Sequence, residues 1–454
     1  MSFVQIESFL KRRVSRGARA ARQWVRAALC CIVVGMPLSA LAADSPSPAE
    51  FRSAPQITKP LKELVSEALQ NNPEIQAARK ELEAAQHRVA PAGALDDPML
   101  EAGFINVPTN SLRFDREEMT MKMIGLSQRL PYPGKRGLRQ DVATKDAETA
   151  SYGYQETVNR VAREIKVAYF DLGLTLEMTG LIEKNKLILE QFLRIAEARY
   201  SVGQGTQADV LKAQTQLSKM TDELLKLARE RPTIEAELNR MLGRGANAAA
   251  PVPAPPQIRE IPLNLESLRD AALTQRPQLL ALQSIVTRNE KALQLARKDY
   301  YPDFDVRFSY GQRDNMPDGA RRSDMVSLTV AINLPVWRDN KLAPRVTESM
   351  AMRDQAQSMY QAQRNEVAAK LRQQAAAVEQ NLKSARLYQT AILPQARLAV
   401  ESALAAYRVN RVDLLMLLDS QMAVFNYEIS LVTAMAGHNK ALAEIDLLTG
   451  KTAF

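Results

Sequence analysis

The chain has 454 residues, of which 46% are hydrophobic and 24% charged, and its formal net charge at pH 7 is +9. Residues 1–42 hold seven basic side chains and one acidic one, so the rest of the chain has 53 basic and 50 acidic residues and a net charge of only +3. This near balance excludes a strongly basic surface, and we therefore expect no nucleic-acid partner. Both cysteines, Cys30 and Cys31, also lie in residues 1–42, which excludes disulfides, thiolate metal sites and cysteine nucleophiles from the remainder.

Residues 1–42 have the pattern of a secretory signal peptide. A long basic segment precedes an apolar stretch at 27–38, and the small-residue sequence Ala40-Leu41-Ala42 follows. We expect cleavage at this point, export of the mature chain, and an N-terminal extension over residues 43–60.

Two kinds of membrane attachment are disfavoured. Lipidation of Cys30 is a poor interpretation because Leu29 stands where a small residue belongs. No other apolar run reaches the about 18 residues that a membrane-spanning helix needs.

The rest of the chain contains an internal duplication. Dipeptides that end in proline recur at a fixed offset, and two later landmarks recur at a slightly larger one. The pairs are Asn72-Pro73 with Arg276-Pro277, Asp97-Pro98 with Tyr301-Pro302, Leu130-Pro131 with Leu334-Pro335, Tyr200 with Tyr407, and Leu242-Gly243 with Thr449-Gly450. These landmarks predict a first repeat at 61–247 and a second at 263–454, joined by a Pro-rich linker at 248–262.

Each repeat is predicted to contain a leading helix, a β-hairpin and then long helices. The hairpins are expected at about 99–130 and 303–335, because apolar and polar residues alternate most clearly over 304–311 and 326–334. The long helices are expected at about 138–242 and 342–449. The predicted fold class is therefore mainly α with a small β part.

Aromatic residues at the hairpin ends favour insertion of the strands into a membrane. Tyr132, Tyr300, Tyr301 and Trp337 lie at one end of the predicted hairpins, where they would mark a membrane interface, and a polar loop at 312–323 lies at the other. The alternative is a soluble sheet or coiled-coil protein. If the strands insert, four strands cannot close a barrel, so several chains must share one.

The two helix-to-helix turns contain the motifs "ARYSVGQGTQADVLKAQTQL" at 198–217 and "AYRVNRVDLLMLLDSQ" at 406–421. These motifs resemble those of TolC-like outer-membrane efflux factors. The segments "LPYPGKRG" at 130–137, "YPDFDV" at 301–306 and "INLPVW" at 332–337 resemble the heavy-metal (CzcC/CusC-like) branch of that family.

The resemblance implies a homotrimer in the outer membrane of a Gram-negative bacterium. Its twelve-stranded β-barrel would continue into a periplasmic α-helical barrel, which would dock a periplasmic adaptor protein and an inner-membrane RND pump. The chain would be a passive exit duct for heavy-metal cations. The alternatives are a drug-efflux or type I secretion channel, or a soluble periplasmic coiled-coil adaptor.

The resemblance also places a gate at the two helix-to-helix turns. Asp209 and Asp419 fall on acidic positions of the family, whereas Met416 and Val412 replace an acid and a gate arginine. An inward-facing Asp would form a ring of three carboxylates in a trimer. The residues assigned to the gate are Tyr200, Gly203, Asp209, Tyr407, Asn410 (in place of a glycine), Arg411, Asp413 and Asp419. For Asp413 the alternative is a helix N-cap, and for Asp419 a solvated helix face.

We expect neither an enzyme nor a cofactor or metal site. The two histidines, His87 and His438, are far apart in sequence and are predicted to lie on the surface. Met119, Met121 and Met123 alternate with other residues and could bind a soft metal ion, but contact with lipid is the favoured interpretation.

Overall fold

A computed structural model of the single chain describes residues 60–255, 257–258 and 260–451. The predicted signal peptide and all but the last residue of the N-terminal extension lie outside these residues. The described part belongs to one compact unit, residues 54–454. None of its helices is both long enough and apolar enough to cross a membrane.

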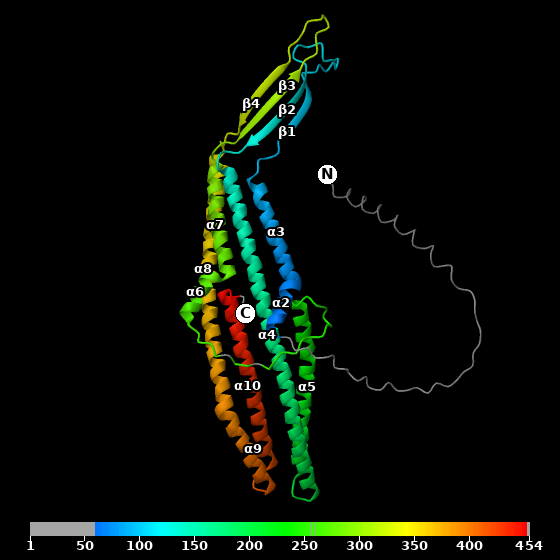
Figure 1. Cartoon of the computed structure of the whole chain (residues 1–454), viewed down its shortest axis with the longest axis vertical. Helices are drawn as coiled ribbons and strands as arrows, with labels where there is room; N and C mark the ends of the chain where they lie inside the picture. Colours follow the sequence, from blue (N-terminus) through cyan, green and yellow to red (C-terminus); the bar gives the residue numbers. More distant parts are fainter. Residues whose placement is uncertain (1–59, 256, 259, 452–454) are drawn as a thin grey trace, which may run out of the picture. The chain divides into compact units, whose positions relative to one another are not determined.

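The described elements occur in the same order in both halves of the chain (Figure 1). The first half contains α2 (Leu61–Asn71), α3 (Pro73–Gly93), β1 (Met99–Ile105), β2 (Met121–Leu130), α4 (Lys135–Ser201) and α5 (Gln207–Met241). The second contains α6 (Leu265–Gln275), α7 (Pro277–Lys298), β3 (Phe304–Gln312), β4 (Met325–Ile332), η1 (Arg338–Leu342), α8 (Ala343–Leu387), η2 (Tyr388–Ile392), α9 (Leu393–Arg408) and α10 (Leu414–Thr449).

Proline explains two departures from the predicted helices. Each half begins with two helices rather than one, because Asn72 and Arg276 precede prolines and adopt extended backbone angles. The 67-residue helix α4 is continuous, whereas its counterpart is divided by the π-turn η2 shortly before Pro394. Proline lacks the N–H that an α-helix would bond at that position, and the π-turn accommodates the change.

The four strands form one antiparallel sheet in the order β1-β2-β3-β4, and the pairing of β2 with β3 joins the two halves (Figure 1). Within this sheet β1 and β4 are the edges. Its register places apolar side chains on one face, including Ile124, Leu126, Phe308, Tyr310, Val326 and Leu328, and polar ones such as Ser127, Arg307 and Thr329 on the other. The apolar face is exposed in the single chain, and Leu328 retains 71% of its accessible surface.

The register contradicts the expected lipid contact of two methionines. Met123 pairs with Gly311, and Met121 lies two residues away on the same side of β2. Both therefore lie on the polar face, opposite Ile124 and Leu126. Their alternation showed only that they share a face, and the pairing of β2 with β3 shows which one.

A buried ion pair joins the sheet to the helices. Lys135, the first residue of α4, is only 2% exposed, and its Nζ lies 2.8 Å from a carboxylate oxygen of Asp303 and 3.0 Å from the carbonyl oxygen of Tyr301. The same Asp303 oxygen accepts the N–H of Tyr132 at 2.8 Å. Loss of one partner would leave an uncompensated buried charge, which costs about 3–5 kcal/mol in other proteins.

Three apolar clusters hold the helices together. One lies among α2, α3, α4 and α5, the second among α4, α5, α9 and α10, and the third among α6, α7, α8 and α10. His438 on α10 is fully buried, with Nδ1 3.2 Å from the carbonyl oxygen of Val378, so its predicted surface position is wrong. The polar neighbours of His438 in sequence concealed this burial; His87 is exposed as predicted.

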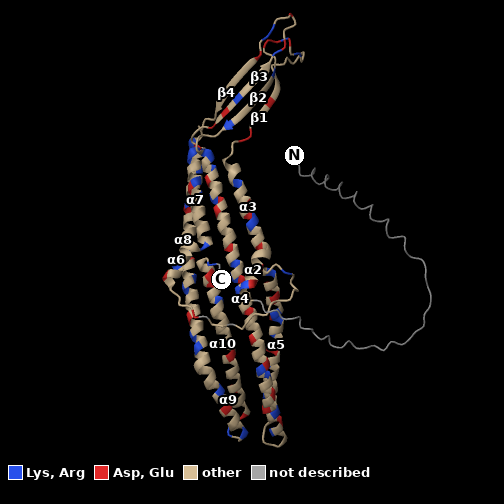
Figure 2. Ribbon diagram, in the orientation of Figure 1, with Lys and Arg blue, Asp and Glu red and all other residues tan. Residues whose placement is uncertain are grey.

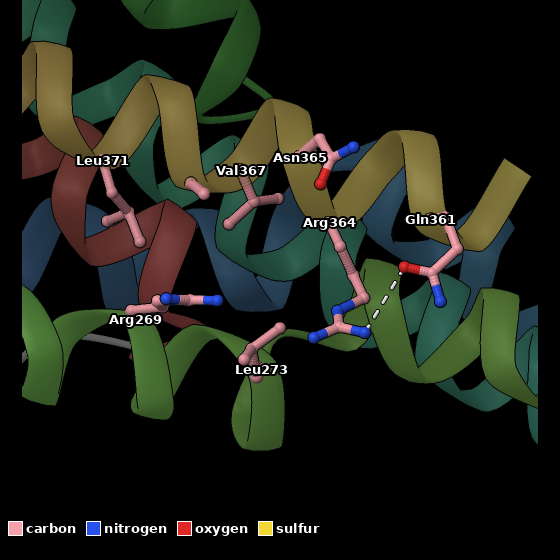
Figure 3. A pocket seen from close by; sticks show the side chains of 8 residues that line it. Arg269, Leu273, Gln361, Arg364, Asn365, Val367 and Leu371 are labelled. Carbon is pink, nitrogen blue, oxygen red and sulfur yellow. Dashed lines mark hydrogen bonds between the residues drawn. The ribbon is translucent and has the colours of Figure 1, made fainter.

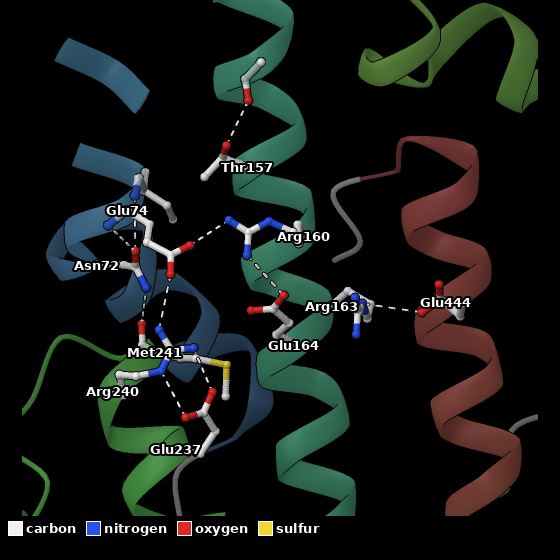
Figure 4. Close-up of polar contacts among 12 residues, drawn as sticks. Asn72, Glu74, Thr157, Arg160, Arg163, Glu164, Glu237, Arg240, Met241 and Glu444 are labelled. Atoms are coloured by element: carbon white, nitrogen blue, oxygen red, sulfur yellow. Dashed lines mark hydrogen bonds and ion pairs between the residues drawn. The ribbon is translucent and has the colours of Figure 1, made fainter. Parts of the chain in front are cut away.

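A charged cluster connects α3, α4 and α5 near the first apolar cluster (Figure 4). Glu74 lies 2.6 Å from Arg160 and 3.2 Å from Arg240, which also contacts Glu237 at 2.7 Å. The hydrogen bond from Arg160 lowers the pKa of Glu74 despite the opposing effect of burial. Because the folded-state pKa is lowered, this stabilisation is present above the ordinary pKa of Glu and is lost as pH falls through the lowered value.

Candidate functional site at the two helix turns

The first turn, residues 202–206, connects α4 to α5. The N–H of Gly203 donates to the carbonyl oxygen of Tyr200 at 3.0 Å, and that of Gln204 donates to Arg199 at 2.9 Å. Gly203 has φ +74°, a conformation that glycine adopts without steric cost and that commonly ends helices. The left-handed backbone conformation therefore explains why a glycine occupies position 203.

The carboxylate of Asp209 takes part in the N-terminal cap of α5. Its Oδ2 accepts the backbone N–H of Thr206 at 3.2 Å and the hydroxyl of the same residue at 2.8 Å. In return, the Thr206 hydroxyl accepts the N–H of Asp209 at 3.2 Å. This reciprocal capping box fixes Asp209 beside the turn.

The second turn, residues 409–413, repeats the backbone course with different side chains. Asn410 has φ +62° and takes the place of Gly203, because asparagine tolerates the left-handed conformation better than most residues. Asp413 takes the place of Thr206, and its side chain accepts the N–H of Met416 at 3.0 Å. Asp413 is therefore the N-cap of α10, the alternative to a gate role that the sequence left open.

Asp419 lies on an exposed face of α10, and no described residue forms an ion pair with it. Leu415 and Met416 are also exposed, while Leu414, Leu417 and Leu418 are buried in the second apolar cluster. The leucine run between the two aspartates therefore packs helices, and Asp419 is left at the surface of the single chain. Arg411 is exposed as well.

Arg199 connects the two turns, which the sequence did not predict. Its guanidinium carbon lies 4.4 Å from the ring centre of Tyr407, and one of its N–H groups donates to the carbonyl oxygen of Tyr407. A second N–H donates to the carbonyl oxygen of Gln204 at 3.3 Å. Comparison of the two repeats gives one hint of this role. The first repeat has an arginine, Arg199, at a position where the second repeat has an uncharged residue, Ala406.

The two tyrosines at the turns have different environments. Tyr407 is buried and Tyr200 is half exposed, although they occupy corresponding positions. Burial raises the pKa of the Tyr407 hydroxyl; Arg199 opposes this shift, and Asp209 adds to it. The hydroxyl has no hydrogen-bond partner among the described residues. The site is therefore asymmetric, with Tyr407 as its buried centre.

The predicted interface aromatics are partly brought together. Tyr132 and Tyr301 stack with ring centres 4.6 Å apart and an angle of 17° between the rings. Trp337 is exposed and lies just before η1, and Tyr300 is half buried.

Another concave region lies between α6 and α8 (Figure 3). Arg269, Leu273, Gln361 and Arg364 are among the residues that line it, and Arg364 donates to the Gln361 side chain at 3.4 Å. Its lining contains arginines, amides and aliphatic side chains. Among the described residues, no group of three or more His, Cys, Asp or Glu side chains could hold a metal ion.

The family model described as "Outer membrane efflux protein" matches residues 64–244 and 268–451. The cobalt-zinc-cadmium resistance protein CzcC of Cupriavidus metallidurans is 22% identical over 399 residues, which cover 86% of this chain and 90% of that protein. The outer membrane efflux protein BepC of Brucella suis is 24% identical over 322 residues, covering 68% of this chain and 67% of its own length.

Solved outer-membrane channels have the same fold. The outer membrane protein VceC of Vibrio cholerae superposes with a TM-score of 0.74 at 18% identity, covering 86% of this chain and 96% of that one. A crystal structure of CusC gives a TM-score of 0.70 at 15% identity and covers 90% and 99% of the two chains.

Replacement of Arg199 by Ala is expected to loosen the contact between the turns. Loss of the ring contact and the hydrogen bonds removes about 1–2 kcal/mol, so amide hydrogen exchange at 202–206 and 409–413 should become roughly 5- to 30-fold faster. Arg411→Ala serves as the control, because this exposed side chain forms no ion pair with a described residue. Equal exchange rates in the two variants would show that Arg199 does not connect the turns.

Proposed function

Because this chain belongs to the outer membrane efflux protein family, we propose that it is the outer-membrane exit duct of a tripartite efflux system. A periplasmic adaptor would connect it to an inner-membrane RND pump, which would supply the energy of transport. The duct itself is passive and needs no cofactor.

The four-stranded sheet is the observation that carries this proposal. It has an exposed apolar face, a polar face and two edge strands, β1 and β4. In lipid an open edge would leave backbone N–H and C=O groups without partners, which is too costly, and bacterial barrels have at least eight strands. A soluble adaptor would have no comparable use for an exposed apolar sheet face.

A homotrimer would pair every edge strand and would also supply enough strands to close a barrel. Three copies give twelve strands when β1 of each chain pairs with β4 of the next, and such a ring has no edge. The apolar face would then contact outer-membrane lipid, and the polar face with Arg307 and Thr329 would line the lumen. Tyr132, Tyr300, Tyr301 and Trp337 would mark the periplasmic interface of the membrane.

The two turns would form the gate at the periplasmic tip of the duct. Threefold symmetry would bring three copies of each turn around one axis, so that Asp413 and Asp419 become rings of carboxylates. Asp209 and Asp413 hold helix caps, and Asp419 is the freer charge. Gly203 and Asn410 set the turn backbones, and Tyr200, Tyr407 and Arg411 flank them.

Heavy-metal cations are the proposed cargo. The support is the similarity to CzcC over most of both chains, together with exposed carboxylates at the turns. Carboxylate rings attract cations, and the sparse metal ligands allow cations to leave again. Drugs and secreted proteins are the alternative cargoes.

Cross-linking of the edge strands tests the trimeric duct. We expect Glu101→Cys/Ser327→Cys, with one thiol on each edge, to give covalent trimers in outer-membrane fractions with a short bifunctional maleimide. Ser127→Cys/Arg307→Cys is the matched control, because these residues pair within one chain and should give monomers only. Monomeric products from both variants would contradict the shared barrel.

Single-channel recording tests the gate assignment. Asp413→Ser keeps a capping oxygen but removes the charge, so Asp413→Ser/Asp419→Asn should lower the preference for cations over anions without unfolding α10. We expect a change of roughly fivefold, since adjacent unit charges in water interact by about 1 kcal/mol. Unchanged selectivity and conductance in the double variant would reject these aspartates as gate residues.

Growth assays test the cargo. Cells that lack the gene should become sensitive to cobalt, zinc or cadmium salts, because the exit route for these ions is closed. Restoring the wild-type gene should restore growth. Sensitivity to drugs alone, with unchanged metal tolerance, would assign the duct to drug efflux instead.

A further inference from the structure

We propose that the pocket between the start of α4 and the end of α7 binds the phosphate headgroup of an anionic glycerophospholipid. This inference rests on the proposed function, which places the junction of sheet and helices at the periplasmic surface of the outer membrane. Nothing in the gate or the barrel closure requires such a site.

The pocket combines polar and aromatic groups in one concave surface. It is lined by Gly134 and Leu138 of the α4 end and by Gln294, Arg297, Lys298 and Tyr301 of the α7 end. The ammonium group of Lys298 lies 5.4 Å from the ring centre of Tyr132 and 5.7 Å from that of Tyr301. Tyrosines are enriched at membrane interfaces, because one end of the ring is apolar and the other can contact water.

The positive charge of this pocket is not neutralised by the neighbouring acids. Asp299 lies 3.6 Å from Lys135 and 3.8 Å from Arg345, and Asp303 is taken by Lys135. Neither Arg297 nor Lys298 forms an ion pair with a described residue. The carboxylates are thus occupied, and the two adjacent cations remain available for an anion.

Further basic residues lie on the helices that meet at this end of the sheet. Figure 2 shows Lys and Arg gathered where α4, α7 and α8 meet the sheet. Arg136 and Arg139 lie in the first turns of α4, and Arg338 and Lys341 lie in η1. A basic surface beside a membrane attracts anionic lipids over distances of about a Debye length.

Both the headgroup and the acyl chains of the lipid would find contacts at this position. Its phosphate would contact Arg297 and Lys298, and its glycerol region would lie at the Tyr132–Tyr301 pair. The acyl chains would then lie along the apolar face of the sheet, which begins with the paired residues Leu130 and Phe304. A free anion would use the cations but would have no use for this adjoining apolar face.

Native mass spectrometry of the purified full-chain trimer tests the site. The trimer is incubated with an equal mixture of phosphatidylglycerol and phosphatidylethanolamine, and the lipids retained are counted. We expect wild type to retain phosphatidylglycerol preferentially. In Arg297→Gln/Lys298→Gln the preference should fall roughly fivefold for each charge removed.

Lys212→Gln/Arg229→Gln is the matched control. These two exposed residues of α5 carry the same charge and form no ion pair with a described residue, so the preference should stay at the wild-type level. Equal retention of phosphatidylglycerol in all three proteins would overturn the proposal. Displacement of the bound lipid by millimolar inorganic phosphate would also overturn it, because a free-anion site would then explain the binding.

Channel recordings separate this result from the proposed function. If the Arg297→Gln/Lys298→Gln trimer conducts like wild type but keeps its preference for phosphatidylglycerol, only the lipid site is rejected. If the wild-type chain neither forms trimers nor conducts in bilayers, the duct itself is rejected, and the lipid site with it.

Discussion

The need to pair the backbone of β1 and β4 is the constraint on which the rest of the molecule depends. One chain supplies four strands, and its sheet ends in two edges with an exposed apolar face. Within lipid this sheet is tolerable only when other copies complete it. The duplication provides the two edges that such pairing requires. The hairpins are joined through β2 and β3, so β1 of the first repeat and β4 of the second are left as the edge strands.

The buried ion pair of Lys135 and Asp303 connects the sheet to the helices. It fixes the first residue of α4 against the segment that leads into β3, so the two repeats are tied together where strand becomes helix. From there α4 and α10 each contribute to two apolar clusters. The same helices end or begin at the two turns, and the turns are therefore positioned by packing that starts at the sheet.

The two repeats share a fold but not their chemistry. A glycine and a capping box in the first turn correspond to an asparagine and an aspartate cap in the second, with the same backbone result. Arg199 has no basic counterpart, and it covers Tyr407 while Tyr200 stays half exposed. The two helix-to-helix turns are thus held together by a contact for which only the first repeat supplies the arginine.

The sequence by itself determined the long helices, the hairpins and the two turns, because proline spacing and hydrophobic periodicity are local signals. It also offered the cap at Asp413 as one of two alternatives, and the hydrogen bond from the Met416 N–H shows that the cap is formed. The tertiary structure alone decided that Met121 and Met123 lie on the polar face, since alternation defines two faces without distinguishing them. It alone showed that His438 is buried and that Arg199 reaches Tyr407, because both depend on which helices lie side by side. Contacts between residues 208 positions apart have no local pattern, and only the packed chain brings them together.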